Sequence, residues 1–298
     1  MKVLLTGAEG QLGRHLRASV PDSVELVTSS RSGGDQPCDL VNADSLARLL
    51  ELVRPDLVIN AAAWTAVDLA EDQPEAAYML NAHVPASLSD WCSRHDAALI
   101  TYSTDYVFDG LPGRAWRESD VTAPQSVYGR SKLEGERAVL ASGARSVIIR
   151  TAWVYSALPG NFLSAILARA ARGEALRVVS DQIGSPTWAG QLAEASWRVL
   201  GIVREQVKGP ELLHVAGAGQ MSWHEFAALA VSRAASIGLV PGPVAVEAIS
   251  SDAWPQKARR PAWSVLDSSR FEQWVGQPSM TVERALEACL NQWKQAPC

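Results

Sequence analysis

The chain has 298 residues, of which 47% are hydrophobic and 20% charged, and its formal net charge is −5. This composition is typical of a folded globular protein, and the acidic balance excludes the broad basic surface that nucleic acid requires. No apolar stretch approaches the ~20 residues of a membrane helix, and the first expected strand begins almost at once. We therefore expect a cytoplasmic protein without nucleic-acid or membrane partners.

Short apolar strands alternate with helical patterns through the first half of the chain. We predict strands at 2–5, 24–28, 57–60, 98–103 and 146–150, and helices at 11–19, 44–53, 85–94 and 131–141. Such an alternation is typical of α/β proteins. It predicts a doubly wound, Rossmann-type parallel sheet with helices on both faces.

The alternation becomes irregular after residue 150. Loops rich in glycine and proline separate helices that we predict at 162–172, 190–200, 222–235 and 281–294. We predict residues 1–150 to be an NAD(P)-binding domain. Residues 151–298 are then mainly a smaller α+β lobe that binds substrate.

A glycine-rich turn follows the first strand. Gly7, Gly10 and Gly13 form the pattern G-x-x-G-x-x-G, and Gln11 and Leu12 open the next helix. Such a loop lets backbone N–H groups and a helix N-terminus approach a pyrophosphate without an intervening side chain. We predict that these five residues bind the phosphates of a dinucleotide, the alternative being a flexible turn.

Hydroxyl groups cluster where the strand 98–103 ends. Ser103 and Thr104 lie at the end of that strand, where open α/β sheets bind their ligands. A hydroxyl at this position can hold a carbonyl oxygen. A serine and threonine that only cap or turn the chain are the alternative.

A tyrosine and a lysine stand four residues apart, so a helix would place them on one face. Tyr128 would need about 4 kcal/mol of preferential stabilisation of its phenolate to bring its pKa from ~10 to about 7. The Lys132 cation at ~4 Å, with an effective dielectric constant of about 20, supplies roughly that much. The pair predicts proton transfer, unless the two residues are merely neighbours on an exposed helix.

With these three motifs in order, the chain resembles the extended short-chain dehydrogenase/reductase family. The resemblance covers almost the whole length, and its most specific segment is 103–110. Other matching segments are 60–68, 150–155, 181–187, 214–219 and 259–261. It also implies that the second half crosses back to the first domain.

The resemblance implies a nucleotide-sugar reductase of cell-surface polysaccharide biosynthesis. Hydride would pass to C4 of a dTDP-linked 4-keto-6-deoxyhexose, so that dTDP-4-dehydro-L-rhamnose becomes dTDP-L-rhamnose. Tyr128 would protonate the carbonyl oxygen that Thr104 holds, and Lys132 would bond the nicotinamide ribose. Further substrate contacts are implied for Asp105, Trp153 and Arg260, the last toward the diphosphate, with a core tryptophan and a solvated basic loop as alternatives.

The second strand ends without the acidic residue that commonly binds the ribose 2′-hydroxyl of NAD. Ser30 and Arg31 stand there instead, and a hydroxyl and a guanidinium suit a 2′-phosphate. We therefore predict NADPH as the cofactor, and the resemblance implies that NADH is also accepted. An exposed loop arginine is the alternative.

The resemblance adds further cofactor contacts. Asp39 and Leu40 are expected beside the adenine, after a third strand. Small residues after the strand 57–60 are expected along the ribose and pyrophosphate: Ala61, Ala62, Ala63 and Thr65. Asn81 either supports this site through a hydrogen bond or lies on a helix surface, so no role is assigned to it.

A catalytic metal is not expected. The cysteines at 38, 92, 289 and 298 and the five histidines lack metal-ligand spacing, and the cysteines are expected to be reduced thiols. Some family members dimerise through Mg²⁺ held by glutamates, but His15 occupies one of those positions. A magnesium-bridged dimer is therefore doubtful, whereas a homodimer as such is left open.

Two other functions compete with this interpretation. Another nucleotide-4-ketosugar reductase or epimerase could share the motifs and form, for example, a 6-deoxytalose product. A non-catalytic regulatory subunit, such as the β subunit of methionine adenosyltransferase, has a similar fold. The intact Thr104, Tyr128 and Lys132 argue against the second alternative.

Overall fold

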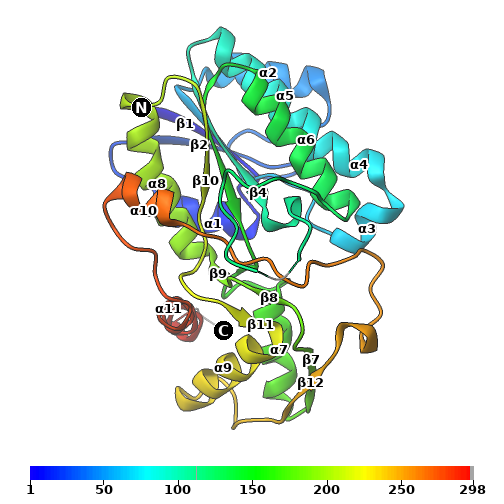
Figure 1. The fold of residues 1–298 in the computed structure, drawn as a ribbon. Coiled ribbons are helices and arrows are strands. Elements are labelled where there is room, and N and C mark those ends of the chain that lie inside the picture. Colours follow the sequence, from blue (N-terminus) through cyan, green and yellow to red (C-terminus); the bar gives the residue numbers. More distant parts are fainter. Residues whose placement is uncertain (112, 296–298) are drawn as a thin grey trace.

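A six-stranded parallel sheet forms one half of the protein (Figure 1). The computed structural model describes residues 1–111 and 113–295, without the side chains of residues 204 and 205. The strand order is β10-β5-β4-β3-β1-β2, and every neighbouring pair is parallel. The strands are β1 (Lys2–Thr6), β2 (Glu25–Ser29), β3 (Leu57–Asn60), β4 (Ala98–Thr104), β5 (Arg145–Thr151) and β10 (Pro210–His214). The predicted Rossmann-type fold is confirmed.

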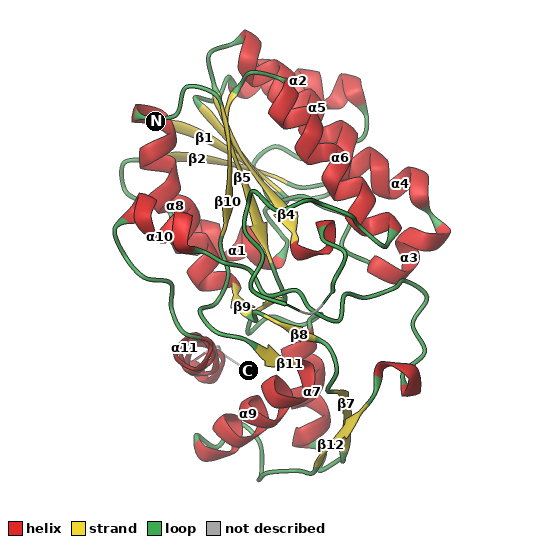
Figure 2. Cartoon of the chain, in the orientation of Figure 1, coloured by secondary structure: helices red, strands yellow, loops and turns green. Residues whose placement is uncertain are grey.

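Helices cover both faces of this sheet (Figure 2). Residues of one strand point alternately to opposite faces. Val3 and Leu5 therefore pack into the cluster beneath α1 (Gln11–Ala18), α8 (Ala189–Glu205) and α10 (Ser269–Val275). Leu4 packs into the cluster beneath α2 (Ala43–Val53) and α5 (Val84–Arg94), and α6 (Val127–Ala141) lies beside α5.

A small lobe lies below the sheet in Figure 1. Its apolar cluster is formed mainly by α7 (Phe162–Ala171), α9 (Trp223–Ser236) and α11 (Val282–Gln295). Three two-stranded ribbons complete it, in the pairs β6 (Val154–Tyr155) with β9 (Thr187–Trp188), β7 (Leu176–Val179) with β12 (Val246–Ile249), and β8 (Ile183–Gly184) with β11 (Met221–Ser222). Because α8, β10 and α10 belong to the sheet layer, residues after 150 contribute to both lobes.

Several elements were not predicted from the sequence. They are α3 (Val67–Asp72), α4 (Pro74–Tyr78), the π-helical turn Met79–His83, the 3₁₀ turns Asp105–Val107 and Ser251–Ala253, α10, β10 and the short ribbon strands. Most are too short to show a periodic pattern. Helix α6 also begins four residues earlier than predicted, because the Ser126 side chain caps it by accepting the Gly129 N–H at 3.1 Å.

The prediction of a third strand before Asp39 is wrong. In the described chain between β2 and α2 there is no strand, because the backbone turns back at Gly34, whose φ is +85°. Asp35 closes this turn by accepting the Thr28 N–H at 2.9 Å and the Thr28 hydroxyl at 2.8 Å. Asp39 and Leu40 therefore lie in the loop that leads into α2.

A buried ion pair fixes α6 to the sheet. Arg150 of β5 donates from Nε to Glu136 Oε1 at 2.8 Å and from Nη2 to Oε2 at 2.6 Å. The guanidinium also lies over the Phe108 ring and beside His214, whose Nδ1 lies 3.0 Å from the Trp116 carbonyl oxygen. The pair thus joins α6, β5, β10 and the loop after β4.

The close packing of α6 yields a first prediction. Gly135→Ala would place a methyl group against the Asn81 carbonyl oxygen, far inside van der Waals contact. We expect this variant to lose about 1–3 kcal/mol of folding free energy. Gly201→Ala, in open space on α8, is the control and should gain about 0.5–1 kcal/mol. Urea unfolding of both variants measures this, and equal effects would contradict the packing described here.

Candidate active site

A cavity of about 450 Å³ opens at the carboxyl ends of β4 and β5, between the sheet and the small lobe. This is the edge at which open α/β sheets bind ligands. Its sheet side is lined by Ser103, Thr104, Asp105, Tyr128 and Thr151. The small lobe contributes the opposite wall, including Tyr155, Asn161, Phe162 and Trp223.

The structure brings Thr104 and Tyr128 together in this cavity. Thr104 is the last residue of β4, and its hydroxyl donates to Asp105 Oδ1 at 2.8 Å and accepts the Tyr106 N–H at 3.2 Å. Tyr128 lies in the first turn of α6, with its ring edge-on to Tyr106. Lys132 follows one turn later and is 5% exposed. The three predicted catalytic residues thus occupy one end of α6 and the adjoining strand end.

The electrostatics of Tyr128 differ from the expectation. Loss of hydration raises the pKa of its phenol, which the Thr104 hydroxyl opposes, and Lys132 is not among the groups that shift it. Burial also lowers the pKa of Lys132 to about 8. Desolvation therefore outweighs the attraction inferred from sequence spacing. Tyr128 keeps its proton near neutral pH, as a proton donor must.

Buried polar atoms without partners surround the same cavity. Within the described residues, no hydrogen bond reaches Ser103 Oγ, Asp105 Oδ2, Thr151 Oγ1 or the Tyr155 hydroxyl. Buried polar groups normally have partners, so these four atoms indicate a site that a polar ligand completes. Burial also raises the pKa of Asp105 to about 6.

The glycine loop fits a dinucleotide phosphate. Gly7 has φ +71°, and a Cβ there would collide with the backbone of Ala61 and Ala62 after β3. A Cβ on Gly13 would collide with the Gly7 carbonyl oxygen. Gly10 caps α1 without a side-chain hydrogen bond, so the first-turn N–H groups remain available to an anion.

Gln11 connects this loop to the small lobe. Its Oε1 accepts a hydrogen bond from Ser156 Oγ at 2.8 Å. Asn161, which caps α7 and lines the cavity, donates to the Ser156 carbonyl oxygen at 3.1 Å. Leu12 follows in the first turn of α1 and packs against the core cluster.

Asn81 is a site residue whose role the sequence left open. It is 1% exposed, so a helix-surface position is excluded. Its Oδ1 accepts the Trp64 N–H at 2.9 Å, and its Nδ2 donates to the Trp64 carbonyl oxygen and to Ser131 Oγ. Asn81 thereby holds the loop Ala61–Thr65 against α6. Ala61, Ala62 and Ala63 are partly buried there, and Thr65 reaches the cavity.

The adenine end of the predicted cofactor site lies beyond β2. Ser30 begins a turn in which its N–H donates to the Gly33 carbonyl oxygen at 3.0 Å, and Arg31 is exposed. Asp39 is exposed as well, whereas Leu40 is buried in the core cluster on the α2 side.

The predicted substrate residues Trp153 and Arg260 both reach the cavity. Trp153 has φ +48°, and its indole stacks on Trp223 with a centroid separation of 3.5 Å. Arg260 binds Asp68 Oδ2 at 2.7 Å and donates to the Tyr106 hydroxyl at 3.1 Å, so it does not lie on a freely solvated loop. Trp223 was not predicted, because only the fold brings it to Trp153.

Residues 1–295 match the family described as RmlD substrate binding domain. A curated dTDP-4-dehydrorhamnose reductase of Burkholderia thailandensis is 40% identical over 285 residues, which covers 93% of each chain. The chain belongs to the dTDP-4-dehydrorhamnose reductase family. This confirms the resemblance inferred from the motifs.

Solved dTDP-4-dehydrorhamnose reductases share the fold of this family member. The Clostridium acetobutylicum protein superposes with a TM-score of 0.90 at 32% identity, covering 99% of this chain and all of the other. The Bacillus anthracis reductase, solved in complex with NADP, has a TM-score of 0.87 at 29% identity, covering 98% and 99%. The alignment spans both the sheet and the small lobe.

Two further observations concern metals and membranes. Within residues 1–111 and 113–295, no three His, Cys, Asp or Glu side chains gather in a way that could hold a metal ion. No helix in the described chain is long and apolar enough to cross a bilayer. Cys38, Cys92 and Cys289 are free and buried, and Cys298 lies outside the described residues.

The raised pKa of Asp105 predicts how stability depends on pH. Because its folded pKa of about 6 exceeds that of the unfolded chain, ionising Asp105 costs stability as pH rises from about 4 to 6, by roughly 3 kcal/mol in total. Asp105→Asn avoids this cost. The thermal midpoint of the variant minus that of the wild type should therefore increase as the pH is raised from 4.5 to 8. A pH-independent difference for Asp105→Asn would contradict the burial argument.

Proposed function

We propose that the protein reduces the C4 keto group of dTDP-4-dehydro-L-rhamnose with NADPH and releases dTDP-L-rhamnose. The observation that carries this proposal is the meeting of Thr104 and Tyr128 in a cavity beside the glycine loop. Membership of the dTDP-4-dehydrorhamnose reductase family supports the substrate. The product would serve cell-surface polysaccharide synthesis.

Tyr128 is the proton donor in this proposal. When bound, the cofactor supplies the hydride, and its phosphates would lie on the first turn of α1. Lys132 would bond the nicotinamide ribose from the next turn of α6. Tyr128 then delivers its proton to the sugar carbonyl oxygen as negative charge develops there.

Asp105 determines whether the Thr104 hydroxyl can donate a hydrogen bond to the sugar carbonyl oxygen. The Thr104 hydroxyl has one hydrogen, and in this structure it is donated to Asp105 Oδ1. Thr104 can donate to a sugar carbonyl only when this hydrogen turns away, or when Asp105 is protonated and itself donates to Thr104. The unpartnered Asp105 Oδ2 can then accept a sugar hydroxyl, which supports a substrate contact from Asp105.

The nucleotide end of the substrate would bind toward the small lobe. The stacked indoles of Trp153 and Trp223 offer a flat apolar surface, and Arg260 supplies a positive charge for the diphosphate. Asp68 and Tyr106 hold that guanidinium in place.

NADPH is proposed as the preferred cofactor, with NADH also accepted. The exposed guanidinium of Arg31, which follows the end of β2, favours a 2′-phosphate. The Bacillus anthracis relative was solved with NADP. The cytoplasmic location and the lack of a bridging Mg²⁺ are predictions from the sequence, which leaves a homodimer open.

Product analysis separates this proposal from its competitors. Incubation with NADPH and a panel of dTDP-, UDP- and GDP-linked 4-ketosugars, followed by NMR of the product, identifies the base and the C4 configuration. A 6-deoxytalose product would require the opposite face of the sugar to receive hydride. A regulatory subunit would oxidise no NADPH with any of these sugars.

Removing the phenol should abolish most turnover. Tyr128→Phe is expected to lower kcat by about 10²–10⁴ while NADPH still binds, because the proton donor is lost and the glycine loop is untouched. Tyr102→Phe is the matched control, since the Tyr102 hydroxyl donates to Ser196 and the residue does not line the cavity. Steady-state kinetics and NADPH titration measure both variants. Near-normal turnover of Tyr128→Phe would refute its assignment.

Arg31→Ala should weaken NADPH much more than NADH, because only NADPH carries the 2′-phosphate. A charge-assisted hydrogen bond contributes about 1.5–3 kcal/mol, so the ratio of kcat/KM for the two cofactors should change by roughly one to two decades. Arg48→Ala, exposed on α2, is the control. Equal losses for both cofactors would show that Arg31 does not contact the phosphate.

A further inference from the structure

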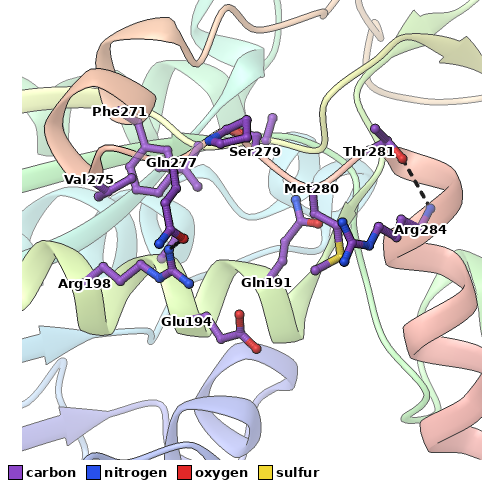
Figure 3. Close-up of a pocket in the computed structure, with 14 residues that line it drawn as sticks. Gln191, Glu194, Arg198, Phe271, Val275, Gln277, Ser279, Met280, Thr281 and Arg284 are labelled. Carbon is purple, nitrogen blue, oxygen red and sulfur yellow. Dashed lines mark hydrogen bonds between the residues drawn. The ribbon is translucent and has the colours of Figure 1, made fainter.

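A second cavity, also of about 450 Å³, lies on the α8 side of the sheet (Figure 3). Its walls are α8, the end of α10 and the segment that leads from α10 into α11. It shares no lining residue with the cavity at Tyr128. Neither the proposed cofactor nor the proposed sugar therefore accounts for it.

Two buried polar atoms in this cavity lack partners. Gln191 of α8 is 8% exposed, and no donor in the described chain reaches its Oε1. The Ser279 hydroxyl oxygen is likewise buried and unpartnered. A buried polar group without a hydrogen-bond partner destabilises the protein unless a water molecule or a ligand provides that partner.

Charged side chains surround these atoms. Gln191, Glu194 and Arg198 follow each other along one face of α8, and Arg284 approaches from the first turn of α11 (Figure 3). The Arg198 guanidinium donates to the Gln277 side chain. In the part of the chain that the structure describes, neither arginine forms an ion pair. Two cations against one carboxylate leave the cavity with an excess of positive charge.

Apolar side chains complete the lining. Phe271 and Val275 from α10 and Met280 from the connecting segment face the same space. A volume of about 450 Å³ falls within the ~300–1,000 Å³ range of small-molecule sites, and a mainly apolar lining with a few polar groups is typical of them. This combination suits an organic molecule better than an inorganic ion.

We propose that this cavity is a second ligand site, which binds a small organic anion that also carries an O–H or N–H donor. The phosphate or carboxylate group binds the Arg284 guanidinium, and the donor forms a hydrogen bond with Gln191 Oε1 beside it (Figure 3). The Ser279 hydroxyl supplies a further polar contact.

The ligand would contact both lobes of the protein. Helix α8 belongs to the sheet layer, whereas α11 packs in the core of the small lobe. Between them, the Met280 carbonyl oxygen accepts the Ala218 N–H at 2.9 Å, and the Val282 N–H donates to the Ala218 carbonyl oxygen at 3.2 Å. A ligand that binds Arg284 of α11 and Gln191 of α8 therefore stabilises the arrangement of the lobes, and it should raise the thermal midpoint.

The test is calorimetric titration of the full-length protein with inorganic phosphate, glucose 1-phosphate, thymidine monophosphate and citrate. Saturation with NADP⁺ in a parallel series blocks anion binding at the glycine loop. We expect at least one organic probe to bind more tightly than inorganic phosphate. Its Kd should rise about tenfold or more in Arg284→Ala and in Gln191→Leu, and stay unchanged in Arg48→Ala. The tightest probe shows whether phosphate or carboxylate is preferred.

Two results would overturn the proposal. One is that every probe binds the wild type and both variants equally, or none binds at up to about 10 mM, a limit that corresponds to very weak affinity. The other is that Arg284→Ala changes the sedimenting mass instead of anion binding, which would make this face a contact between copies of the chain. The titration measures binding and involves no turnover. Its result therefore does not depend on whether the reductase assignment is correct.

Discussion

The ion pair between Arg150 and Glu136 is the interaction on which the arrangement of the active site depends. Both side chains are almost completely buried, at 4% and 2% exposure, and the guanidinium meets the carboxylate through two hydrogen bonds. Breaking such a pair by removing one partner is expected to cost about 3–5 kcal/mol. Glu136 lies one and two helical turns beyond Lys132 and Tyr128, so the pair also sets the rotation of α6 about its axis. The pair thus fixes the orientation of the helix face that carries Lys132 and Tyr128, and Tyr128 lines the cavity.

Burial is the common cause of the unusual chemistry in this cavity. It raises the pKa of Tyr128 and Asp105 and lowers that of Lys132, so each group is shifted toward its neutral form. It also leaves several hydroxyl oxygens without partners. Buried polar atoms without partners destabilise the protein when the cavity is empty, and a polar substrate would provide those partners. The polar groups of this cavity are therefore arranged to bind a polar ligand.

Much of the fold could be predicted because its causes are local. Apolar strands, the glycine loop and the Tyr128–Lys132 spacing are all visible within a few residues. The sequence did not reveal that Asn81 holds Trp64 and Ser131, or that Trp223 stacks on Trp153, because these partners are distant in the chain. The direction of the Tyr128 pKa shift was mispredicted for a related reason, since spacing shows which charge is near but not how much water is lost.

The short hydrogen-bond chain from Gln11 through Ser156 to Asn161 couples two parts of the protein that are far apart in sequence. Gln11 belongs to the glycine loop, and Asn161 belongs to the wall of the cavity at Tyr128. A dinucleotide that displaces the loop also displaces Ser156, and with it the cap of α7. The glycine loop and the cavity at Tyr128 are thus mechanically linked through Ser156. Because such coupling is reciprocal, a change in shape at either place is transmitted to the other.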